Sequence, residues 1–286
     1  MILEYIKAVI YGIVEGVTEW LPISSTGHLI LLERIIPLNI GAVDEEFTRQ
    51  YTAMFDVVVQ LGAVLAVLCL YLKRLDPFGK EKKEARHLWL RLILCTLPAA
   101  VIGLAADTLC NRFFGCELDA LLFKPRVVAC ALIVYGMLFI LVERLSLNES
   151  KPSSSTPPSI RSTLAIGVFQ ALAIIPGTSR SGATILGARI LGISRSAAAE
   201  FSFFAAIPVI AAASLLKGVE FIEYVSNSAF VIPAEALLVL AITGIVAFAV
   251  SMLTIKFLTD FVKKHSFIPF GIYRILLGIA VLFFVN

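Results

Sequence analysis

The sequence predicts an all-α integral membrane protein with two inverted-topology repeats, each a re-entrant helical hairpin plus three transmembrane helices. Composition is the first observation behind this prediction, because 59% of the 286 residues are hydrophobic and only 16% are charged. The second is a series of long apolar runs. The third is a pair of apolar stretches that polar turns interrupt at matching places. Together these features favour the bilayer as the main solvent of the chain.

The charge pattern argues against nucleic acid as a partner. The net charge is only +3, and the lysines and arginines lie in short clusters between apolar runs, not along one basic face. The N-terminal segment differs from a cleavable signal peptide, because Glu4, Glu15 and Glu19 interrupt the apolar core that a signal needs. We therefore expect this segment to belong to the mature protein.

Six stretches are predicted to span the membrane. A spanning helix needs about 20 predominantly apolar residues to cross a hydrocarbon core of about 30 Å. Three such stretches lie in each half of the chain, at residues 55–72, 88–106, 127–142, 201–216, 236–253 and 270–285. Each is expected to cross the bilayer once.

Two further apolar stretches are predicted to be re-entrant hairpins. Residues 6–36 are interrupted by Pro22-Ile-Ser-Ser-Thr-Gly, and residues 164–191 by Pro176-Gly-Thr-Ser-Arg-Ser-Gly. The arms on either side have roughly 10–15 residues, which is short for a full crossing. We therefore expect each stretch to enter the bilayer, turn at its polar segment and leave on the side it came from.

The two hairpins are also similar to each other. The run from Gly12 to Gly27 aligns with the run from Gly167 to Gly182 and brings the two polar turns into register. We predict a first repeat over residues 1–150, a Pro- and Ser-rich linker over 151–160 and a second repeat over 161–286. Because each repeat crosses the membrane an odd number of times, the second repeat starts on the opposite side and is inverted.

Loop charges predict the orientation. A basic cluster between Lys73 and Arg86 is expected to face the cytoplasm. Counting crossings from that loop places residues 144–161 and 256–274 in the cytoplasm and both chain termini on the outer side. The first hairpin then enters from the outer face and the second from the cytoplasmic face. Their polar turns are expected to meet inside the membrane, where irregular backbone is tolerated if protein buries it.

The arm that leads into the first polar turn carries two carboxylates. Glu15 and Glu19 are spaced i,i+4 and share one helix face, and ionisable side chains at membrane depth are functional candidates by default. Two close carboxylates also suit a hard divalent cation such as Mg²⁺ or Ca²⁺. The alternative is that one of them only forms an ion pair with Arg180.

Hydroxyls and an imidazole follow in the same segment, as Ser24, Ser25, Thr26 and His28. Such groups are the usual nucleophiles and proton-transfer groups of enzymes. The simpler interpretation is N-capping of the next helix. Capping accounts for one hydroxyl, but not for three in a row or for a histidine on the same side of the arm.

The second polar turn has the composition of an anion site. Arg180 lies between Ser179 and Ser181 where a helix is expected to begin, and Thr184 follows one turn later. Free N–H groups at a helix N-terminus attract phosphate, and a guanidinium adds a bidentate, permanently charged partner. The alternative is a structural pair with Glu19, which leaves the surrounding hydroxyls without a role.

The run Glu15-Gly-Val-Thr-Glu-Trp-Leu-Pro-Ile-Ser-Ser-Thr-Gly-His28 resembles the glutamate-rich motif of the undecaprenyl-diphosphate phosphatases, the bacitracin-resistance family. The run Pro176-Gly-Thr-Ser-Arg-Ser-Gly-Ala-Thr184 resembles that family's second motif, and the stretch from Phe55 to Gly62 is similar as well. The similarity covers essentially the whole chain.

The resemblance implies hydrolysis of undecaprenyl diphosphate to the monophosphate, which recycles the lipid carrier for cell-wall glycan synthesis and confers bacitracin resistance. It implies dependence on a divalent metal, with a polyprenyl diphosphate and membrane lipids as partners. It also implies a place in the bacterial inner membrane, with an active site open to the outer side.

On this basis we expect a diphosphate site formed by Arg180 together with Ser24, Thr26, Ser179, Ser181 and Thr184. Glu19, alone or with Glu15, would hold the metal or act as general base. Ser25 is the preferred nucleophile. His28 is the proton donor or an alternative nucleophile, and attack by water is a third route.

Other classes of protein fit part of the pattern. Inverted repeats with paired broken hairpins also build secondary transporters, and a lipid-carrier flippase would share that plan. The type 2 phosphatidic acid phosphatases need a histidine six residues after their arginine, where this chain has Leu186. The sequence is compatible with a homodimer but does not determine the oligomeric state. A disulfide between Cys110 and Cys116, which we place in one loop, is likewise left open.

Overall fold

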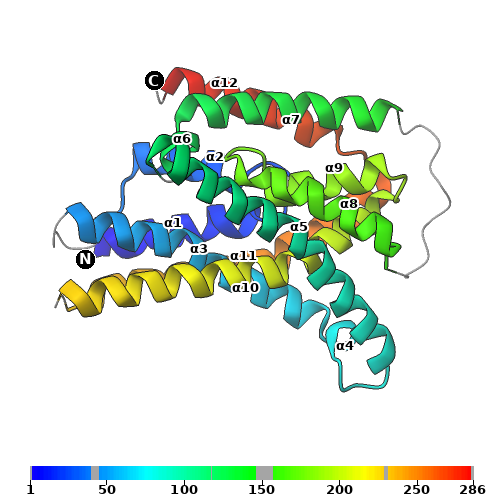
Figure 1. Cartoon of the computed structure of the whole chain (residues 1–286), viewed down its shortest axis with the longest axis horizontal. Helices are drawn as coiled ribbons and strands as arrows, with labels where there is room; N and C mark the ends of the chain where they lie inside the picture. The colour runs from blue at the N-terminus through cyan, green and yellow to red at the C-terminus, as the bar shows by residue number, and fades with distance from the viewer. Residues whose placement is uncertain (1, 40–44, 117, 146–156, 229–230, 285–286) are drawn as a thin grey trace.

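The computed structural model describes residues 2–39, 45–116, 118–145, 157–228 and 231–284. Every regular element in this part of the chain is a helix, and five of the helices are long and apolar enough to cross a membrane. The prediction of an all-α membrane protein is therefore confirmed. Most of the helices run along the long axis of the molecule (Figure 1).

The first half of the chain starts with two helices joined by a tight turn, which occupy the predicted hairpin at residues 6–36. Three longer helices follow, with a short helix between each and the next. In chain order the elements are α1 (Ile2–Thr18), α2 (Ser25–Ile35), α3 (Glu45–Leu70), α4 (Leu72–Leu75), α5 (Lys82–Phe114), α6 (Leu118–Leu122) and α7 (Pro125–Leu145).

The second half repeats this order. Its first helices occupy the predicted hairpin at residues 164–191, and three long helices follow. The elements are α8 (Ile160–Ala171), the 3₁₀ turn η1 (Leu172–Ile174), α9 (Arg180–Ile190), α10 (Arg195–Ser228), α11 (Ala234–Lys264) and α12 (Ile268–Phe284). Residues 151–156 of the predicted linker, and residue 285 of the last predicted span, lie outside the described residues.

The predicted spans fall on these helices, but most of the helices are longer than predicted. For example, α5 has 33 residues and α10 has 34, and each continues through an internal proline, Pro98 and Pro208. Helices of that length measure about 50 Å at about 1.5 Å per residue, which exceeds a hydrocarbon core of about 30 Å. Apolar runs mark only the middle of such helices, because charged residues occupy their ends.

Corresponding helices pack in corresponding pairs. α1 packs on α11, α8 packs on α5, and α7 packs on α12. The first two pairs approach closely at glycine: a Cβ built on Gly12 would lie 2.7 Å from a carbonyl oxygen of α11, and one built on Gly167 would lie 2.4 Å from a carbonyl oxygen of α5. Small residues allow such close packing of apolar helices. Each pair takes one helix from each half, while the inverted orientation across a bilayer stays a prediction.

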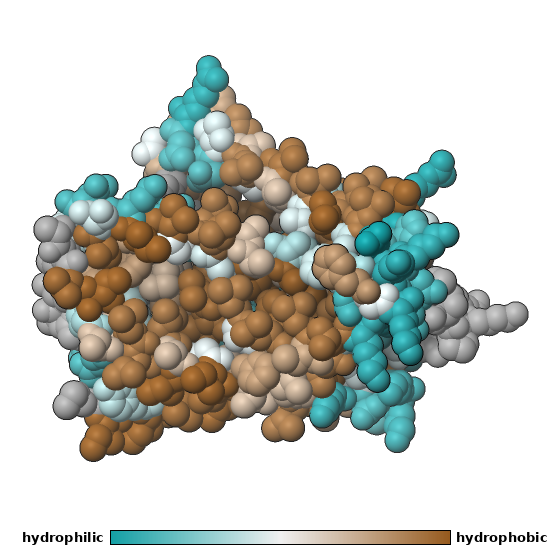
Figure 2. All heavy atoms as spheres, turned by 90° about the horizontal axis from the view of Figure 1, so that it is seen from below, coloured by the Kyte–Doolittle hydropathy of each residue, from teal (hydrophilic) through white to brown (hydrophobic). Residues whose placement is uncertain are grey.

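The surface suits a lipid environment. Figure 2 shows a wide field of hydrophobic residues, with hydrophilic residues gathered toward one end of the long axis. Large apolar side chains point outward along the long helices, for example Leu104 at 70% exposure and Leu253 at 69%. Apolar surface of this extent is expected where lipid replaces water.

The two cysteines predicted to share a loop do not share one. Cys110 is buried inside α5, whereas Cys116 follows the end of that helix, and both are free. The helix continues to Phe114 because Gly115, with a left-handed φ of 67°, ends it only there.

Candidate active site

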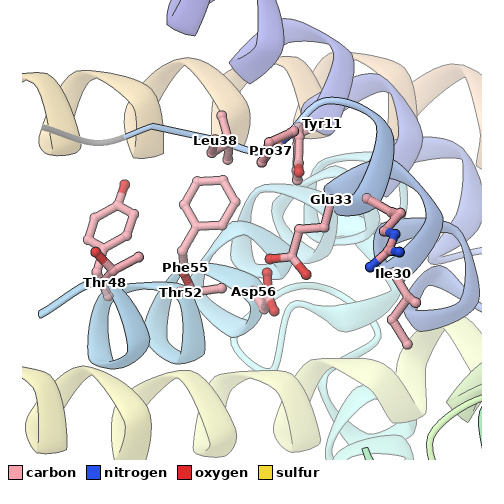
Figure 3. A pocket seen from close by; sticks show the side chains of 11 residues that line it. Tyr11, Ile30, Glu33, Pro37, Leu38, Thr48, Thr52, Phe55 and Asp56 are labelled. Atoms are coloured by element: carbon pink, nitrogen blue, oxygen red, sulfur yellow. The ribbon is translucent and has the colours of Figure 1, made fainter. Parts of the chain in front are cut away.

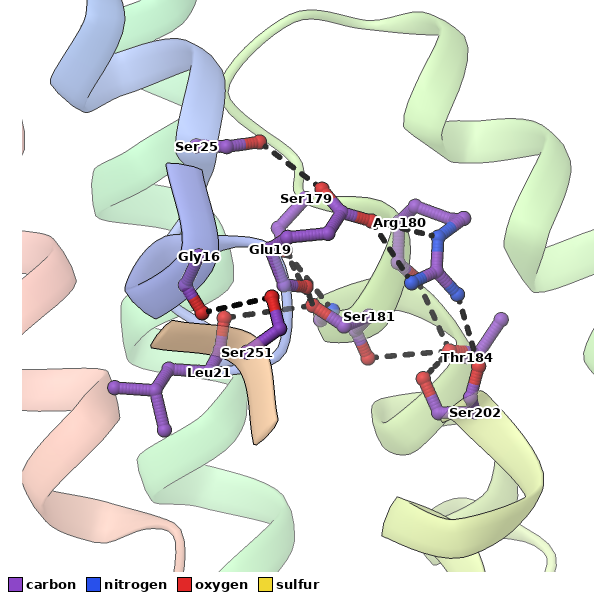
Figure 4. Close-up of polar contacts among 11 residues, drawn as sticks. Gly16, Glu19, Leu21, Ser25, Ser179, Arg180, Ser181, Thr184, Ser202 and Ser251 are labelled. Carbon is purple, nitrogen blue, oxygen red and sulfur yellow. Dashed lines mark hydrogen bonds and ion pairs between the residues drawn. The ribbon is translucent and has the colours of Figure 1, made fainter. Parts of the chain in front are cut away.

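Two turns between short helices form the centre of the site. The first turn, residues 19–24, joins α1 to α2 and contains Pro22. The second turn, residues 175–179, joins η1 to α9 and contains Pro176. Proline breaks both helical hairpins, because it lacks a backbone N–H and its ring clashes with the preceding helical turn. Figure 4 shows side chains from the two turns facing each other.

Each turn ends in a serine with left-handed backbone. Ser24 has a φ of 74° and Ser179 a φ of 69°, and within the described residues no other non-glycine residue has positive φ. Ser24 Oγ accepts a hydrogen bond from the Gly27 N–H over 3.3 Å, and Ser179 Oγ accepts one from the Gly182 N–H over 3.1 Å. Both serines therefore cap the helix that follows, and Ser24 is fully buried.

Glu19 of the first turn and Arg180 of α9 form an ion pair. Arg180 donates to Glu19 Oε1 from Nη2 over 3.0 Å and from Nε over 3.3 Å. Its Nη1 donates to the Ser202 carbonyl oxygen over 2.9 Å, and the guanidinium lies 5.9 Å from the ring of Trp20. The two paired side chains are only 11% and 7% exposed. The structure thus brings together the acid and the cation that the sequence placed on separate turns.

Ser25 lies next to this pair. Its hydroxyl donates to Glu19 Oε2 over 3.4 Å, so Glu19 uses one oxygen toward Arg180 and the other toward Ser25. Ser25 is half-buried and begins α2. Thr26 is also half-buried, and within the described part of the chain its hydroxyl makes no hydrogen bond. Of the predicted hydroxyls, Ser25 is the one that touches a carboxylate.

His28 is oriented by two contacts. Its Nδ1 lies 2.7 Å from the Ser24 carbonyl oxygen and its Nε2 lies 2.7 Å from the Tyr273 hydroxyl. A carbonyl oxygen only accepts, so Nδ1 of the neutral ring carries the proton and Nε2 accepts from Tyr273. The His28 and Tyr273 rings are stacked with an interplanar angle of 7°. The structure does not place His28 against Ser25 or Glu19.

Ser181 and Thr184 tie the two turns together. Ser181 Oγ donates to the Glu19 carbonyl oxygen over 3.0 Å, and Thr184 Oγ1 lies 2.7 Å from Ser202 Oγ. Each residue is about 1% exposed. The sequence predicted both as phosphate ligands. The structure places them beside Arg180 with their hydroxyls directed at protein acceptors.

Glu15 is the part of the site that lacks a partner. It is 2% exposed, and neither carboxylate oxygen makes a hydrogen bond within the described residues. No group of three or more His, Cys, Asp or Glu side chains in that part of the chain converges to hold a metal. Mg²⁺, however, is typically bound by one or two carboxylates with substrate phosphates and water. An unpartnered Glu15 one helical turn from Glu19 fits a cation of that kind.

Sequence reasoning missed Arg274. It belongs both to the residues 256–274 that were expected in the cytoplasm and to the predicted span 270–285, and its placement in a loop was wrong. α11 extends to Lys264 and α12 begins at Ile268, so Arg274 lies inside α12, where it is fully buried. It contacts carbonyl oxygens of both turns. The available signal was a guanidinium within an otherwise apolar helix.

A pocket of about 430 Å³ lies between α1, α2 and α3. Figure 3 shows its lining, in which the carboxylates of Glu33 and Asp56 lie close together. Asp56 belongs to the stretch from Phe55 to Gly62 that the sequence analysis singled out. Neither Glu19 nor Arg180 lines this pocket. The chemistry suggested by the two turns is therefore separate from this pocket.

Both α2 and α9 begin at the ion pair, with Ser25 and Arg180 as their first residues. The free N–H groups and positive dipole ends of two helices therefore point to one small region that also holds a guanidinium. Such a region suits an anion with several oxygens, such as a phosphate. The neighbouring hydroxyl and carboxylates supply a nucleophile and groups that accept protons or bind a cation.

Comparisons with known proteins agree with this chemistry. A family model described as bacitracin resistance protein BacA matches residues 8–280. A protein of Acetivibrio thermocellus named undecaprenyl-diphosphatase is 49% identical over 99% of this chain and 98% of its own length. Proteins of Streptococcus mutans, named undecaprenyl-diphosphatase, and Clostridioides difficile, named undecaprenyl-diphosphatase 1, are 48% and 45% identical, each over 98% of this chain and 96% of their own length. The chain belongs to the bacitracin resistance protein BacA family.

Proposed function

We propose that this protein is an undecaprenyl-diphosphate phosphatase, which releases the terminal phosphate of the lipid and returns the monophosphate for cell-wall glycan synthesis. Bacitracin resistance, which the family's name states, is part of the proposed role. The observation that carries the proposal is the buried pair of Glu19 and Arg180 at the N-termini of two helices. Relatives named undecaprenyl-diphosphatase, aligned over nearly the full chain, support it.

The terminal phosphate would bind to Arg180 and to the N-terminal N–H groups of α2 and α9. Arg180 is held by the Ser202 carbonyl through Nη1, so its orientation does not depend on Glu19 alone. Nη2 and Nε face the site and can exchange a carboxylate oxygen for phosphate oxygens. Thr26 and Ser179 lie at the same helix ends. Charge neutralisation at this point would supply most of the rate enhancement.

Ser25 is the nucleophile that the geometry favours. In this mechanism its Oγ forms a bond to the terminal phosphorus while the bridging P–O bond breaks, and undecaprenyl phosphate leaves. Glu19 Oε2 already accepts a hydrogen bond from the Ser25 hydroxyl, and in this step it takes the hydroxyl proton. Water then attacks the phosphoserine and regenerates Ser25 with release of phosphate. Both ring nitrogens of His28 are engaged, by the Ser24 carbonyl and by Tyr273, which favours an orienting role over nucleophilic attack.

A divalent cation, Mg²⁺ or Ca²⁺, fits beside the unpartnered Glu15 and the neighbouring Glu19. When bound, it would neutralise charge on the diphosphate oxygens and the departing phosphate. Glu15 would supply the carboxylate ligand, because Oε1 of Glu19 faces Arg180 and its Oε2 faces Ser25. Substrate oxygens and water would complete the coordination.

The proposed setting is the bacterial inner membrane, with both termini and the site opening on the outer side. The start of α1 and the end of α12 lie toward the end of the long axis opposite to α4 (Figure 1). The segment from Lys73 to Arg86, which includes α4, carries the basic cluster expected in the cytoplasm. A tagged terminus that is digested by protease in intact cells lacking an outer membrane would support this orientation, and a protected one would contradict it.

The phosphatase proposal is tested with purified protein in detergent. Phosphate release from undecaprenyl diphosphate is measured with and without chelator, and compared with a short-chain prenyl diphosphate. We expect release that a chelator suppresses and added Mg²⁺ or Ca²⁺ restores. Lys263→Ala, which removes a surface pair with Asp260, is the matched control and should keep full activity.

The competing hypothesis is a secondary transporter or lipid flippase, which the paired helix breaks at residues 19–24 and 175–179 also suit. Hydrolysis needs no compartments, whereas transport is visible only in sealed vesicles. A protein that moves the lipid across vesicles but releases no phosphate in detergent would contradict the enzymatic proposal.

Trapping the intermediate tests the nucleophile. A single turnover with substrate labelled in the terminal phosphate, quenched in acid, should leave label on Ser25. Absence of labelled protein at early times, with phosphate appearing in one phase, would favour direct attack by water.

A further inference from the structure

Arg274 of α12 connects the two turns. Its Nη1 donates to the Pro22 carbonyl oxygen in the first turn over 3.2 Å. Its Nη2 donates to the carbonyl oxygens of Gly177 and Thr178 in the second turn, each over 2.8 Å. One planar guanidinium therefore bridges two segments that lie about half the chain apart. No other side chain in the described residues donates to both turns in this way.

The environment of Arg274 is unusual for a cation. The residue is 0% exposed and lies between the rings of Tyr135 and Phe139 of α7, at 5.6 and 5.9 Å from their centroids. Within the described residues its hydrogen-bond acceptors are carbonyl oxygens, not a carboxylate. A buried charge without an anionic partner is unfavourable, so apolar packing alone does not account for an arginine here.

The carbonyls that Arg274 contacts lie next to the two strained residues. Pro22 is two positions before Ser24, and Thr178 directly precedes Ser179, the two serines with positive φ. Such backbone conformations cost of order 1–3 kcal/mol and persist only where the surroundings impose them. Arg274 is placed to impose the conformation of both turns at once. The arrangement also needs Gly182, because a Cβ there would lie 2.8 Å from Arg274 Nη1.

The residue next to Arg274 acts on the same site. Within the described residues Tyr273 donates to no carbonyl oxygen of the turns, but its hydroxyl donates to His28 Nε2 over 2.7 Å. Two consecutive residues of α12 thus contact the first turn, the second turn and the arm that follows the first turn. α12 belongs to the second half of the chain and packs along α7 of the first half.

We propose that Arg274 is a positioning residue of the active site. It holds the two turns in one register, so that Glu19 and Arg180 face the same phosphate group. The inference rests on the phosphatase function proposed above. Lysine cannot substitute, because a single ammonium lacks the planar set of donors that reaches three carbonyl oxygens in two directions.

The test compares Arg274→Lys and Arg274→Met with wild type, measuring kcat, KM and the melting temperature of the detergent-solubilised protein. We expect Arg274→Lys to lower kcat by about 10²-fold, because misplacement by about 1 Å can have that effect. KM should stay within about threefold, since the lost contribution acts in the transition state. Activities are measured well below the melting temperature of each variant, so that all of the protein is folded.

Arg189→Lys is the matched control. Arg189 is 4% exposed, donates to Glu143 over 2.8 Å and to the Ile193 carbonyl over 2.8 Å, and touches neither turn. This variant should lower the melting temperature and keep kcat within about threefold of wild type. An equal loss of kcat in Arg189→Lys and Arg274→Lys would show a general effect of buried arginines and would overturn the positioning role.

Gly182→Ala tests the inference without removing the charge. The added Cβ pushes on Arg274 Nη1, so we expect about a tenfold loss of kcat from misplacement and faster amide exchange in residues 20–24 and 175–179. Unchanged exchange and kcat would overturn the inference. If the wild type releases phosphate and Arg274→Met is equally active, the positioning role is wrong but the proposed function stands. If the wild type releases no phosphate, both the proposed function and the positioning role are wrong.

Discussion

The two turns share a backbone and differ in chemistry. Ser24 and Ser179 are 155 positions apart (179 minus 24), and both have left-handed φ and cap a following glycine N–H. The same offset relates Gly27 to Gly182 (182 minus 27). The first turn and the helix ends on either side of it nevertheless carry two acids together with Ser25 and His28, whereas the second turn is followed by Arg180. One local structure thus occurs twice, and each copy brings a different charge to the shared site.

Equivalent positions show how the two turns diverged. Glu15 corresponds to Gln170, and the amide of Gln170 donates to a carbonyl oxygen of α5 over 3.4 Å. Glu15 has no partner within the described residues. Glu19 corresponds to Ile174, and Ser25 corresponds to Arg180. The comparison shows that the backbone of a broken hairpin supplies helix ends that bind anions. A few differences in side chains then decide which turn binds the phosphate and which provides the proton acceptor.

Removing the cation of the second turn should have the largest effect. Arg180→Ala is expected to lower kcat by about 10³-fold, because loss of one strong donor to a transition-state oxyanion costs about 10²–10³ in rate and this side chain offers two nitrogens. The measurement is phosphate release at saturating substrate, with melting temperature as the folding control. Activity within tenfold of wild type would remove Arg180 from the site and make the two turns chemically equivalent.

Neutralising the acid of the first turn should have the next largest effect. Glu19→Gln is expected to lower kcat by about 10²-fold, since it removes the proton acceptor of Ser25 but keeps a side chain of similar shape. The matched variant is Ile174→Val at the equivalent position of the second turn, which we expect to retain activity. If both variants lose activity equally, Glu19 has no special role, and the assignment of the proton acceptor to the first turn is wrong.

Glu15→Gln makes the first turn resemble the second, where position 170 is glutamine. We expect about a tenfold rise in the Mg²⁺ or Ca²⁺ concentration needed for half-maximal activity, because a metal site loses a carboxylate ligand. Binding of the ion alone, measured by calorimetry with the purified protein, should weaken in parallel. Unchanged metal dependence and unchanged binding would place the cation elsewhere.

The smallest effect is expected at the shared backbone. Ser24→Ala and Ser179→Ala should each lower the free energy of unfolding by about 1 kcal/mol, since each removes one N-cap hydrogen bond. The melting temperatures of the two variants are the measurement. Similar decreases in melting temperature would support equivalent structural roles for the two turns. A decrease in only one of the two variants would show that the two serines do not have the same structural role.

The fold was predictable where the signal is local. Apolar runs broken by Pro22 and Pro176 predict two hairpins, because the breaks and the arm lengths can be counted along the chain. The ends of the helices were harder to predict from the sequence. Charged and polar residues interrupt the apolar pattern toward both ends of α5 (82–114), so the span of 88–106 marked only its centre.

The candidate site was predictable in its residue types and less so in its contacts. Glu19 and Arg180 were expected near each other because two hairpins that enter from opposite faces bring their turns together inside the membrane, and an ion pair between them was the alternative to phosphate binding. The partners of Ser181 and Arg274 depend on carbonyl oxygens 162 and 252 positions away, and no local pattern encodes such pairs. The hydroxyls of Ser181 and Thr184 consequently looked free in the sequence, although they bind protein atoms in the fold.

A double-mutant cycle on Glu19 and Arg180 tests most directly whether the two turns form one site. kcat/KM is measured for wild type, Glu19→Gln, Arg180→Lys and the double variant under identical metal and detergent conditions. We predict that the double variant is about as impaired as the worse single variant, with a coupling energy of about 1–3 kcal/mol. Losses that multiply across the two substitutions would mean that the side chains act independently, and would contradict the shared site.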